Sequence, residues 1–473
     1  TRPCQLKPSK EFDPRQYRIN RLGNVPTFIP TNIVENSVKA TISCISKDIA
    51  GFNFGPNIRP VYTFQEAVQG IDGEVFINSI KRNTSPGYPY IHMKGFSTRK
   101  EIFGDNEKCN MDIPQCKILQ VRVERIIELA KQGVVIEHVF MDTLKDERKP
   151  IHKAHKTRLF SAGPLDYLIA CKMYFNGIVA VLQKSRNYSK VSVGTNPLSY
   201  DWDVIARELL RKSKLMVAGD FEGFDATQSI QLLEGAAEVL IALSQRFCGT
   251  SDEDAMVMRT LMVSLFNSVH VSGDCIYQWT HSLPSGHYLT AIINSIYVNL
   301  AFSSIWQIGF QKFSVMHVHS FYEECGIVAY GDDHIVSIPE HRIDIFNQFT
   351  IPELFKLIGL SYTMEDKDAI VEKPYRKLED ISYLKRSFEF DSDRQRWVGP
   401  LSIDTILESP MWIHQCSDEQ TQCGEQIDGS LRELAVHSKD KWYWSKVFDT
   451  CAQEIGHFSK FLEYEEVRAF VLD

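Results

Sequence analysis

Residues 325–338 read Cys-Gly-Ile-Val-Ala-Tyr-Gly-Asp-Asp-His-Ile-Val-Ser-Ile, and they hold the most informative pattern in the chain. Two runs rich in β-forming residues, 327–330 and 334–338, flank Gly331-Asp332-Asp333, which predicts a hairpin with acidic residues at its turn. Adjacent carboxylates repel each other unless a cation lies between them, and Mg²⁺ is commonly held by one or two carboxylates plus substrate phosphates. Asp and Gly are also ordinary turn residues, so a solvated acidic loop stays open as an alternative.

A second acidic site lies upstream of this hairpin. Residues 215–220 form a short apolar run that ends on Asp220, which predicts a buried strand, and Asp225 follows five residues later. A strand that delivers Asp220 beside Asp332 would build a two-metal site suited to in-line phosphoryl displacement. Asp225 has a structural alternative as the N-cap of a helix that begins after Ala226. Helical spacing of apolar residues resumes over 230–242.

Composition limits the possible classes of protein. The 473 residues correspond to about three domains. With 44% hydrophobic and 24% charged residues, the chain is neither disordered, collagenous nor a multi-span membrane protein. Its 52 basic and 60 acidic residues give a net charge of −8, so a nucleic acid would need a local basic patch. Residues 145–158 offer one, with six Lys or Arg and two acids, although charge runs are often solvated loops.

The rest of the chain indicates a mixed α+β protein without regular βαβ alternation. Residues 1–115 are rich in proline and turn signals, which predicts loops, and 118–131 have the spacing of an amphipathic surface helix. The last eighty residues predict a mostly helical C-terminal domain. Residues 289–310 are the best candidate for a membrane span, but six interspersed polar residues favour a buried helix.

The termini and cysteines give further expectations. The first twenty residues are basic and lack an apolar core, so we expect no signal peptide. A start at Thr1 rather than Met suggests proteolytic release or trimming. The eleven cysteines follow no repeated spacing and predict reduced, buried thiols. His414, Cys416 and Cys423 match no common zinc spacing, so zinc is disfavoured.

Several segments together resemble the conserved motifs of the RNA-dependent RNA polymerases of picorna-like viruses. Residues 220–225, then Ser285-Gly286 with Thr290 and Asn294, then residues 330–333 resemble motifs A, B and C in the family's order. Residues 84–89 resemble motif G, 145–158 motif F, Lys367 with its neighbours motif D, and 383–386 motif E. Seven motifs in order span residues 84–386, which is most of the chain.

The resemblance implies a fold and a domain organisation. The expected fold class is α+β, a right-hand polymerase with encircling fingers, a palm whose antiparallel sheet packs on helices, and a small helical thumb. The implied boundaries are fingers over 1–180 and 228–275, palm over 181–227 and 276–388, and thumb over 389–473.

The resemblance also implies an activity, namely template-directed transfer of nucleoside monophosphates to an RNA 3′ end. Two Mg²⁺ ions, replaceable by Mn²⁺, would be held by Asp220, Phe221 and Asp332, with Asp333 as an outer or partial ligand. Lys367 would protonate the leaving pyrophosphate as a general acid, although a plain surface lysine stays open.

Further residues are implied to bind nucleotide and RNA. Asp225 and Asn294 would hydrogen-bond the ribose 2′-hydroxyl, supported by Ser285, which has an alternative as a helix N-cap, and Thr290. An amide on an apolar helix is costly to bury without a partner, which favours a functional role for Asn294. The triphosphate would meet Lys145, Lys153, Lys156 and Arg158; RNA would meet Thr84, Ser85, Gly87, Gly286, Lys385 and Arg386. Lys385 and Arg386 also fit a surface pair.

The implied partners are an RNA template and primer, nucleoside triphosphates, a uridylylated viral peptide as primer, and other viral replication proteins. The implied location is the host cytoplasm at membrane-associated replication complexes, with a soluble chain. Picornaviral enzymes begin with a glycine that docks into the fingers, so Thr1-Arg2-Pro3 puts that docking in doubt. Residues 160–164 and 191–196 are similar to insect dicistrovirus and iflavirus enzymes.

Two other functions would share part of this pattern. A reverse transcriptase also uses a Tyr-Xaa-Asp-Asp turn, but it places an aromatic steric gate where this chain has Asp225 and lacks the Asn294 partner. An RNA-binding scaffold that lost its chemistry would not need the ligand carboxylates, all of which are present here.

Overall fold

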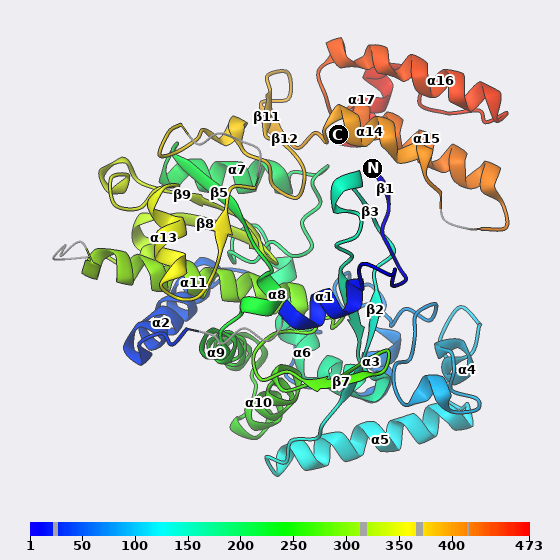
Figure 1. The fold of residues 1–473 in the computed structure, drawn as a ribbon, viewed down its shortest axis with the longest axis vertical. Helices are drawn as coiled ribbons and strands as arrows, with labels where there is room; N and C mark the ends of the chain where they lie inside the picture. The colour runs from blue at the N-terminus through cyan, green and yellow to red at the C-terminus, as the bar shows by residue number, and fades with distance from the viewer. Residues whose placement is uncertain (22–26, 313–318, 366–371, 414–415) are drawn as a thin grey trace.

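The computed structural model describes residues 1–21, 27–312, 319–365, 372–413 and 416–473. At its centre lies a four-stranded antiparallel sheet with strand order β10-β5-β9-β8 (Figure 1). Its strands are β5 (Met216–Phe221), β8 (Gly326–Tyr330), β9 (Asp333–Ser337) and β10 (Tyr362–Thr363). The predicted hairpin is therefore confirmed as β8–β9, with Tyr330 opposite Asp333, and the predicted strand at 215–220 is confirmed as β5.

Both faces of this sheet are buried. Helix α11 (Thr290–Lys312) packs on one face and α7 (Asp201–Lys212) on the other (Figure 1). On β5, Val217 belongs to the large core that includes α11, whereas Met216 and Ala218 pack in a smaller core with Trp202 of α7. Two covered faces explain why these strands read as continuous apolar runs rather than as an alternating pattern.

A second four-stranded sheet, ordered β4-β2-β6-β7, carries the basic segment between two of its strands. Its strands are β2 (Val139–Leu144), β4 (Leu159–Ala162), β6 (Val269–Ser272) and β7 (Cys275–Gln278), and β2 pairs with β6 in parallel. The helices that build the core beside it are α5 (Pro114–Lys131), α6 (Leu165–Lys184), α9 (Ile230–Cys248) and α10 (Asp252–Phe266). The helices predicted at 118–131 and 230–242 are confirmed and are longer than expected.

The first 115 residues hold more helix than the prediction of loops allowed. They contain α1 (Pro14–Arg21), α2 (Thr31–Asp48), α3 (Phe64–Gln69), α4 (Arg99–Phe103) and the start of α5. Helix α2 was missed because small polar residues occupy core positions on it. Ser37 Oγ lies 3.1 Å from Ser304 Oγ of α11, and Thr41 Oγ1 lies 2.7 Å from the Tyr322 hydroxyl. Hydroxyls that satisfy one another in the core conceal the apolar periodicity.

The C-terminal residues form a helical group with a core of its own, as predicted, and Figure 1 shows these helices together in orange and red. They are α14 (Ile403–Glu408), α15 (Glu419–Leu434), α16 (Ser445–Glu454) and α17 (Tyr464–Leu472), preceded by the hairpin β11 (Glu389–Asp391) and β12 (Arg396–Val398). The remaining elements are β1 (Arg2–Pro3), β3 (Arg148–Lys149), α8 (Phe224–Thr227), α12 (Phe321–Glu324), α13 (Thr350–Lys356) and six short 3₁₀ turns.

Within the described chain, two helices are long and apolar enough to span a membrane by length and composition alone, namely α6 and α11. Of their apolar windows, 78% and 83% of residues are buried inside the protein, which is typical of core helices. The predicted buried helix at 289–310 is therefore confirmed.

Candidate active site

Strand register places three carboxylates at one end of the central sheet. Gly219 of β5 lies opposite His334 of β9, and the next residue, Asp220, pairs across to Thr363 of β10. Asp220 is therefore level with Asp333, beside the β8–β9 turn that carries Asp332. The charge of Asp220 raises the pKa of both Asp332 and Asp333. The sheet thus brings together the two acidic sites that the sequence keeps more than a hundred residues apart.

Burial is the main cause of the pKa shifts at this site. It raises the pKa of Asp333 to about 7, with Asp332 and Asp220 adding to the effect. Asp225 is exposed to solvent, but many protein atoms surround its carboxylate. Their desolvating effect and the charge of Asp332 raise the pKa of Asp225 to about 6, although the charges of Arg158 and Arg18 act to lower it. Crowded carboxylates of this kind are relieved by a bound cation or by protonation.

The carboxylate oxygens at this site are better suited to binding Mg²⁺ than to forming a closed structural metal site. The part of the chain that the structure describes holds no group of three or more His, Cys, Asp or Glu arranged for a metal. Asp220 and Asp332 supply oxygen donors, and Mg²⁺ completes its shell with waters and substrate phosphates. Asp333 is turned partly away, since its Oδ2 accepts the N–H of Leu384 at 2.7 Å. The ring of Phe221 is buried among aromatic residues, so only its carbonyl oxygen is available.

The acidic turn (residues 330–333) is fastened by hydrogen bonds to two other elements. The N–H of Gly331 donates to Ser295 Oγ at 2.8 Å, and that hydroxyl donates to Ala291 O on α11. His334 Nδ1 lies 2.7 Å from the carbonyl oxygen of Asp332, and its Nε2 lies 2.9 Å from the Tyr362 hydroxyl. Burial lowers the pKa of His334 to about 4, so the ring is neutral, donates from Nδ1 and accepts from Tyr362.

Sequence reasoning missed these supporting residues. Ser295 and Tyr362 come from other elements, and nothing in their local sequence points to the acidic turn. His334 carried the one usable signal, a polar residue inside the apolar run 334–338.

The residues expected to recognise ribose lie on α8 and α11. Asp225 lies inside α8, whose N-cap is Gly223, so the N-cap alternative for Asp225 is wrong. Asn294 is buried on α11, and its Oδ1 accepts from Gln228 Nε2 at 2.7 Å. Gln228 directly follows α8 and therefore links Asn294 to the segment that carries Asp225.

The hydroxyls of Ser285 and Thr290 support backbone in this structure. Ser285 Oγ donates to the carbonyl of Leu159 at 3.1 Å, and Thr290 Oγ1 donates to that of Pro284 at 2.7 Å. Ser285 does not cap α11, because the helix begins at Thr290. The Ser285 hydroxyl therefore ties the loop before α11 to strand β4, and the Thr290 hydroxyl ties the same loop to the start of α11.

The basic segment (residues 145–158) faces the carboxylates through Arg158. Its Nε donates to both carboxylate oxygens of Glu147, at 2.9 and 3.0 Å, and its charge interacts with Asp225 and Asp332. Arg158 directly precedes strand β4, which begins at Leu159. The other three predicted cations, Lys145, Lys153 and Lys156, are exposed.

The N-terminal residues hold this segment in a way that the sequence did not predict. Strand β1 pairs with β3, with Arg2 opposite Lys149. Arg18 Nε on α1 donates to the carbonyl of Thr157 at 2.9 Å. Strand β1 and helix α1 thus hold the basic segment in place.

The residues predicted to bind template surround a cavity of about 530 Å³. Thr84, Ser85 and Gly286 line it, and Gly87 lies beside the loop at Gly163. A Cβ on Gly286 would lie 2.0 Å from the carbonyl oxygen of Ser161, and one on Gly87 would lie 2.4 Å from that of Gly163. Both positions therefore need glycine, because backbone approaches backbone there.

The two residues predicted to touch the primer differ. Lys385 is exposed, in a left-handed backbone conformation with φ 62°. Arg386 is buried, and its guanidinium binds the Glu433 carboxylate of α15 at 2.7 and 2.9 Å and the carbonyl of Gly399. The expectation of an RNA contact at Arg386 is therefore corrected, since its donors are already taken inside the protein. Lys367 and His414 lie outside the described residues.

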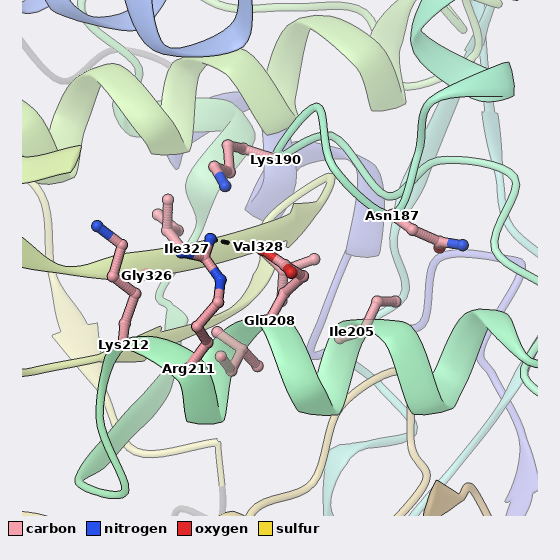
Figure 2. A pocket seen from close by; sticks show the side chains of 10 residues that line it. Asn187, Lys190, Ile205, Glu208, Arg211, Lys212, Gly326, Ile327 and Val328 are labelled. Atoms are coloured by element: carbon pink, nitrogen blue, oxygen red, sulfur yellow. Dashed lines mark hydrogen bonds and ion pairs between the residues drawn. The ribbon is translucent and has the colours of Figure 1, made fainter. Parts of the chain in front are cut away.

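A small pocket elsewhere on the sheet also gathers basic residues. Figure 2 shows Lys190, Arg211 and Lys212 around Gly326–Val328, the end of β8 remote from the acidic turn. Arg211 pairs with Glu208, Lys190 with Asp48, and Lys212 donates to the carbonyls of Tyr322 and Glu323. These cations are satisfied within the protein, so the pocket does not compete with the acidic site.

The sequence of this chain resembles those of known proteins. Residues 35–454 match the family model described as viral RNA-dependent RNA polymerase. The replicase polyprotein of acute bee paralysis virus is 34% identical over 411 residues, which cover 84% of this chain and 21% of that protein. That of cricket paralysis virus is 32% identical over 460 residues, covering 93% and 26%. The chain thus spans about a fifth to a quarter of these relatives.

A solved structure shares the fold. The sicinivirus 3Dpol RNA-dependent RNA polymerase superposes with a TM-score of 0.80 at 20% sequence identity, covering 100% of this chain and 92% of that one. This likeness confirms the predicted fold class, an α+β right hand.

Proposed function

Because the chain belongs to the viral RNA-dependent RNA polymerase family, we propose that it copies an RNA template by transferring nucleoside monophosphates to an RNA 3′ end. The observation that carries the proposal is the register that sets Asp220 beside the turn of Asp332 and Asp333. Two carboxylates with coupled charges at the end of a rigid sheet suit a cation that also holds phosphate.

Asp220, Asp332 and the carbonyl oxygen of Phe221 would hold two Mg²⁺ ions, with Asp333 in an outer position, and Mn²⁺ can replace them. When bound, the ions polarise the primer 3′-hydroxyl and neutralise charge on the triphosphate and the leaving pyrophosphate. The protein keeps the carboxylates in place through the bonds from Ser295 and His334. We assign the proton donor for pyrophosphate to Lys367.

Selection of ribonucleotides would rest on Asp225 and Asn294. Asn294 keeps its amide oxygen on Gln228 and can turn a donor to the ribose 2′-hydroxyl, and Asp225 can accept from that hydroxyl. A polar site built for a hydroxyl rejects the deoxy analogue, because its own groups are then unpaired. Ser285 and Thr290 hold the supporting loop.

The triphosphate path would follow exposed cations, and the template path would follow the cavity that Thr84, Ser85 and Gly286 line. Lys145, Lys153, Lys156 and Arg158 would meet the triphosphate with charge-assisted hydrogen bonds. Thr84, Ser85, Gly87 and Gly286 would border the template, and Lys385 the primer. We assign fingers to 1–180 and 228–275, palm to 181–227 and 276–388, and thumb to 389–473.

The partners follow from this function. The polyprotein relatives fit release from a precursor and work beside other viral replication proteins. The small C-terminal domain fits initiation on a uridylylated viral peptide, and the expected location is the host cytoplasm at membrane-associated replication complexes.

The test is incorporation of labelled UTP on poly(A) with an oligo(U) primer and Mg²⁺. The wild-type protein should extend the primer and should strongly prefer UTP to dTTP. Asp332→Ala should lose this activity while it still binds RNA. Equal use of dTTP would favour a reverse transcriptase. RNA binding without extension on oligo(U) or on a tyrosine-bearing viral peptide would favour the scaffold.

A further inference from the structure

Gln228 is a fully buried amide that lies beside Asn294, and no sequence motif points to it. It directly follows α8, the short helix that carries Asp225. Its Nε2 donates to Asn294 Oδ1 at 2.7 Å, and its own Oε1 has no hydrogen-bond partner within the described residues. A buried amide with an unmet acceptor lowers stability. A leucine of similar size would fill the same space without that cost, so packing alone does not account for the amide.

The backbone beside Gln228 is fixed on α11. The N–H of Ser229 donates to the Tyr297 hydroxyl at 2.8 Å. Asn294 and Tyr297 lie three residues apart on α11 and therefore on the same face of that helix. Two consecutive residues, Gln228 and Ser229, are thus bound to α11 about one turn apart. The Nε2 donor of Gln228 therefore has a fixed position relative to Asn294.

A fixed donor at Gln228 decides which end of the Asn294 amide is left for a ligand. Oδ1 of Asn294 is taken by Gln228, which leaves Nδ2, and Nδ2 makes no hydrogen bond to any part of the chain that the structure describes. A hydroxyl has one proton to donate and lone pairs with which to accept. Because an ionised Asp225 can only accept, a sugar hydroxyl needs a donor from its second partner. The opposite amide orientation would offer that hydroxyl two acceptors, of which it could satisfy only one.

We propose that Gln228 is a positioning residue for sugar selection, because it holds Asn294 Oδ1 and thereby directs the Nδ2 donor of Asn294 to the ribose 2′-hydroxyl. The inference rests on the proposed function and adds to it a residue that touches no substrate. The hydroxyl would donate to Asp225 and accept from Asn294, and a deoxynucleotide would leave both protein groups unpaired. Without Gln228, the Asn294 amide is free to present either end.

The first test measures kcat/KM of the full chain for single incorporations of UTP and of 2′-deoxy-UTP opposite adenine. Gln228→Leu should lower kcat/KM for UTP about tenfold and leave that for 2′-deoxy-UTP within about twofold, because only the hydroxyl uses the directed donor. Gln228→Met, whose flexible side chain adapts to the buried space, should give the same result. A UTP preference that stays at the wild-type value in both variants would overturn the inference.

Gln231→Leu is the matched control. Gln231 lies three residues farther along the chain, and its amide binds the backbone of Ile29, with hydrogen bonds of 2.7 and 2.8 Å. Its loss should affect UTP and 2′-deoxy-UTP equally, as should any variant that is merely packed less well. The ratio of the two kcat/KM values therefore separates the positioning role of Gln228 from a purely structural one.

A double-mutant cycle tests whether Gln228 acts through Asn294. In an Asn294→Ala background, Gln228→Leu should cause no further loss of UTP preference, because the amide that it positions is already gone. A second loss of about tenfold in that background would show a role independent of Asn294 and overturn the inference. Failure of the proposed function has a different signature, since the wild-type protein would then incorporate no UTP or use both nucleotides equally, and the inference would fail with it.

Discussion

The acidic turn and the basic segment present opposite charges to the same space, yet they are built differently. The acidic turn is fixed by hydrogen bonds to Ser295 of α11 and to the His334–Tyr362 pair, and its Asp333 accepts the N–H of Leu384. The basic segment exposes Lys145, Lys153 and Lys156, and its strongest side-chain bond joins Arg158 to Glu147 within the segment itself.

The difference follows from the chemistry that each region would perform. Mg²⁺ demands near-octahedral geometry, so its carboxylates must stand in fixed positions before substrate arrives. A triphosphate carries many oxygens, and long flexible cations can follow it without a fixed frame. The carboxylates, which must stand in fixed positions, are therefore held by buried hydrogen bonds. The lysines of the basic segment need only supply charge and are exposed.

The largest effect should come from breaking the acidic side. Asp220→Asn should lower primer extension by at least about 10³-fold, because it removes a fixed charge opposite the reacting phosphates. Lys153→Gln should lower it by less than about fivefold, since neighbouring cations share that contact. Steady-state extension with matched RNA affinities checks both values. Similar losses in the two variants would contradict the contrast between the regions.

Arg158 tests whether the basic segment has one fixed member. Arg158→Gln should raise the KM for nucleotide by about 10- to 100-fold, with a smaller change in kcat, because a charge-assisted hydrogen bond is worth about 1.5–3 kcal/mol. Glu147→Gln is the control, since it keeps Arg158 and weakens the carboxylate contacts that Glu147 makes within the segment, to Arg158 and to Lys149. A KM unaffected by Arg158→Gln would place the triphosphate elsewhere.

Removing a hydrogen bond that holds the acidic turn should have a smaller effect, and this effect should be on kcat rather than on the KM for nucleotide. His334→Phe keeps an aromatic ring in the buried site but removes the bond to the carbonyl of Asp332. We expect kcat to fall about tenfold with the KM for nucleotide unchanged, because the metal-binding carboxylate loses its position while nucleotide contacts remain. Tyr362→Phe removes the outer bond only and should fall between His334→Phe and wild type. A change in KM alone would argue against this role.

The last prediction concerns stability rather than activity. The fold raises the pKa of Asp333 to about 7, above its ordinary value of 3.8, so the ionised carboxylate destabilises the metal-free protein. This cost is full above pH 7 and shrinks as the pH falls toward 3.8. Asp333→Asn should therefore stabilise the metal-free protein by about 1–3 kcal/mol at pH 8 and by less at pH 5. Denaturant unfolding at both pH values with EDTA measures it, and an equal gain at both would contradict the assignment.

The carboxylates could be predicted from the sequence because the residues that reveal them lie beside them in the chain. Asp332 lies in the turn between two β-rich runs, and Asp220 ends another run, so each was found from its own segment. Gln228 and Ser295 were missed because their hydrogen-bond partners lie on other elements. Arg386 was misread for the same reason, since Glu433 meets it only after the C-terminal helices pack. Helix α2 was hidden by Ser and Thr residues whose partners lie on α11 and α12.

The central claim is that Asp220 and Asp332 hold a shared metal. Fe²⁺ in place of Mg²⁺, with ascorbate and peroxide, generates hydroxyl radicals that cut the polypeptide next to the bound ion. We expect cuts near both residue 220 and residue 332 in the wild-type protein, and loss of both cuts in Asp220→Asn and in Asp332→Asn. A cut near residue 332 that persists in Asp220→Asn would show separate sites and contradict the account.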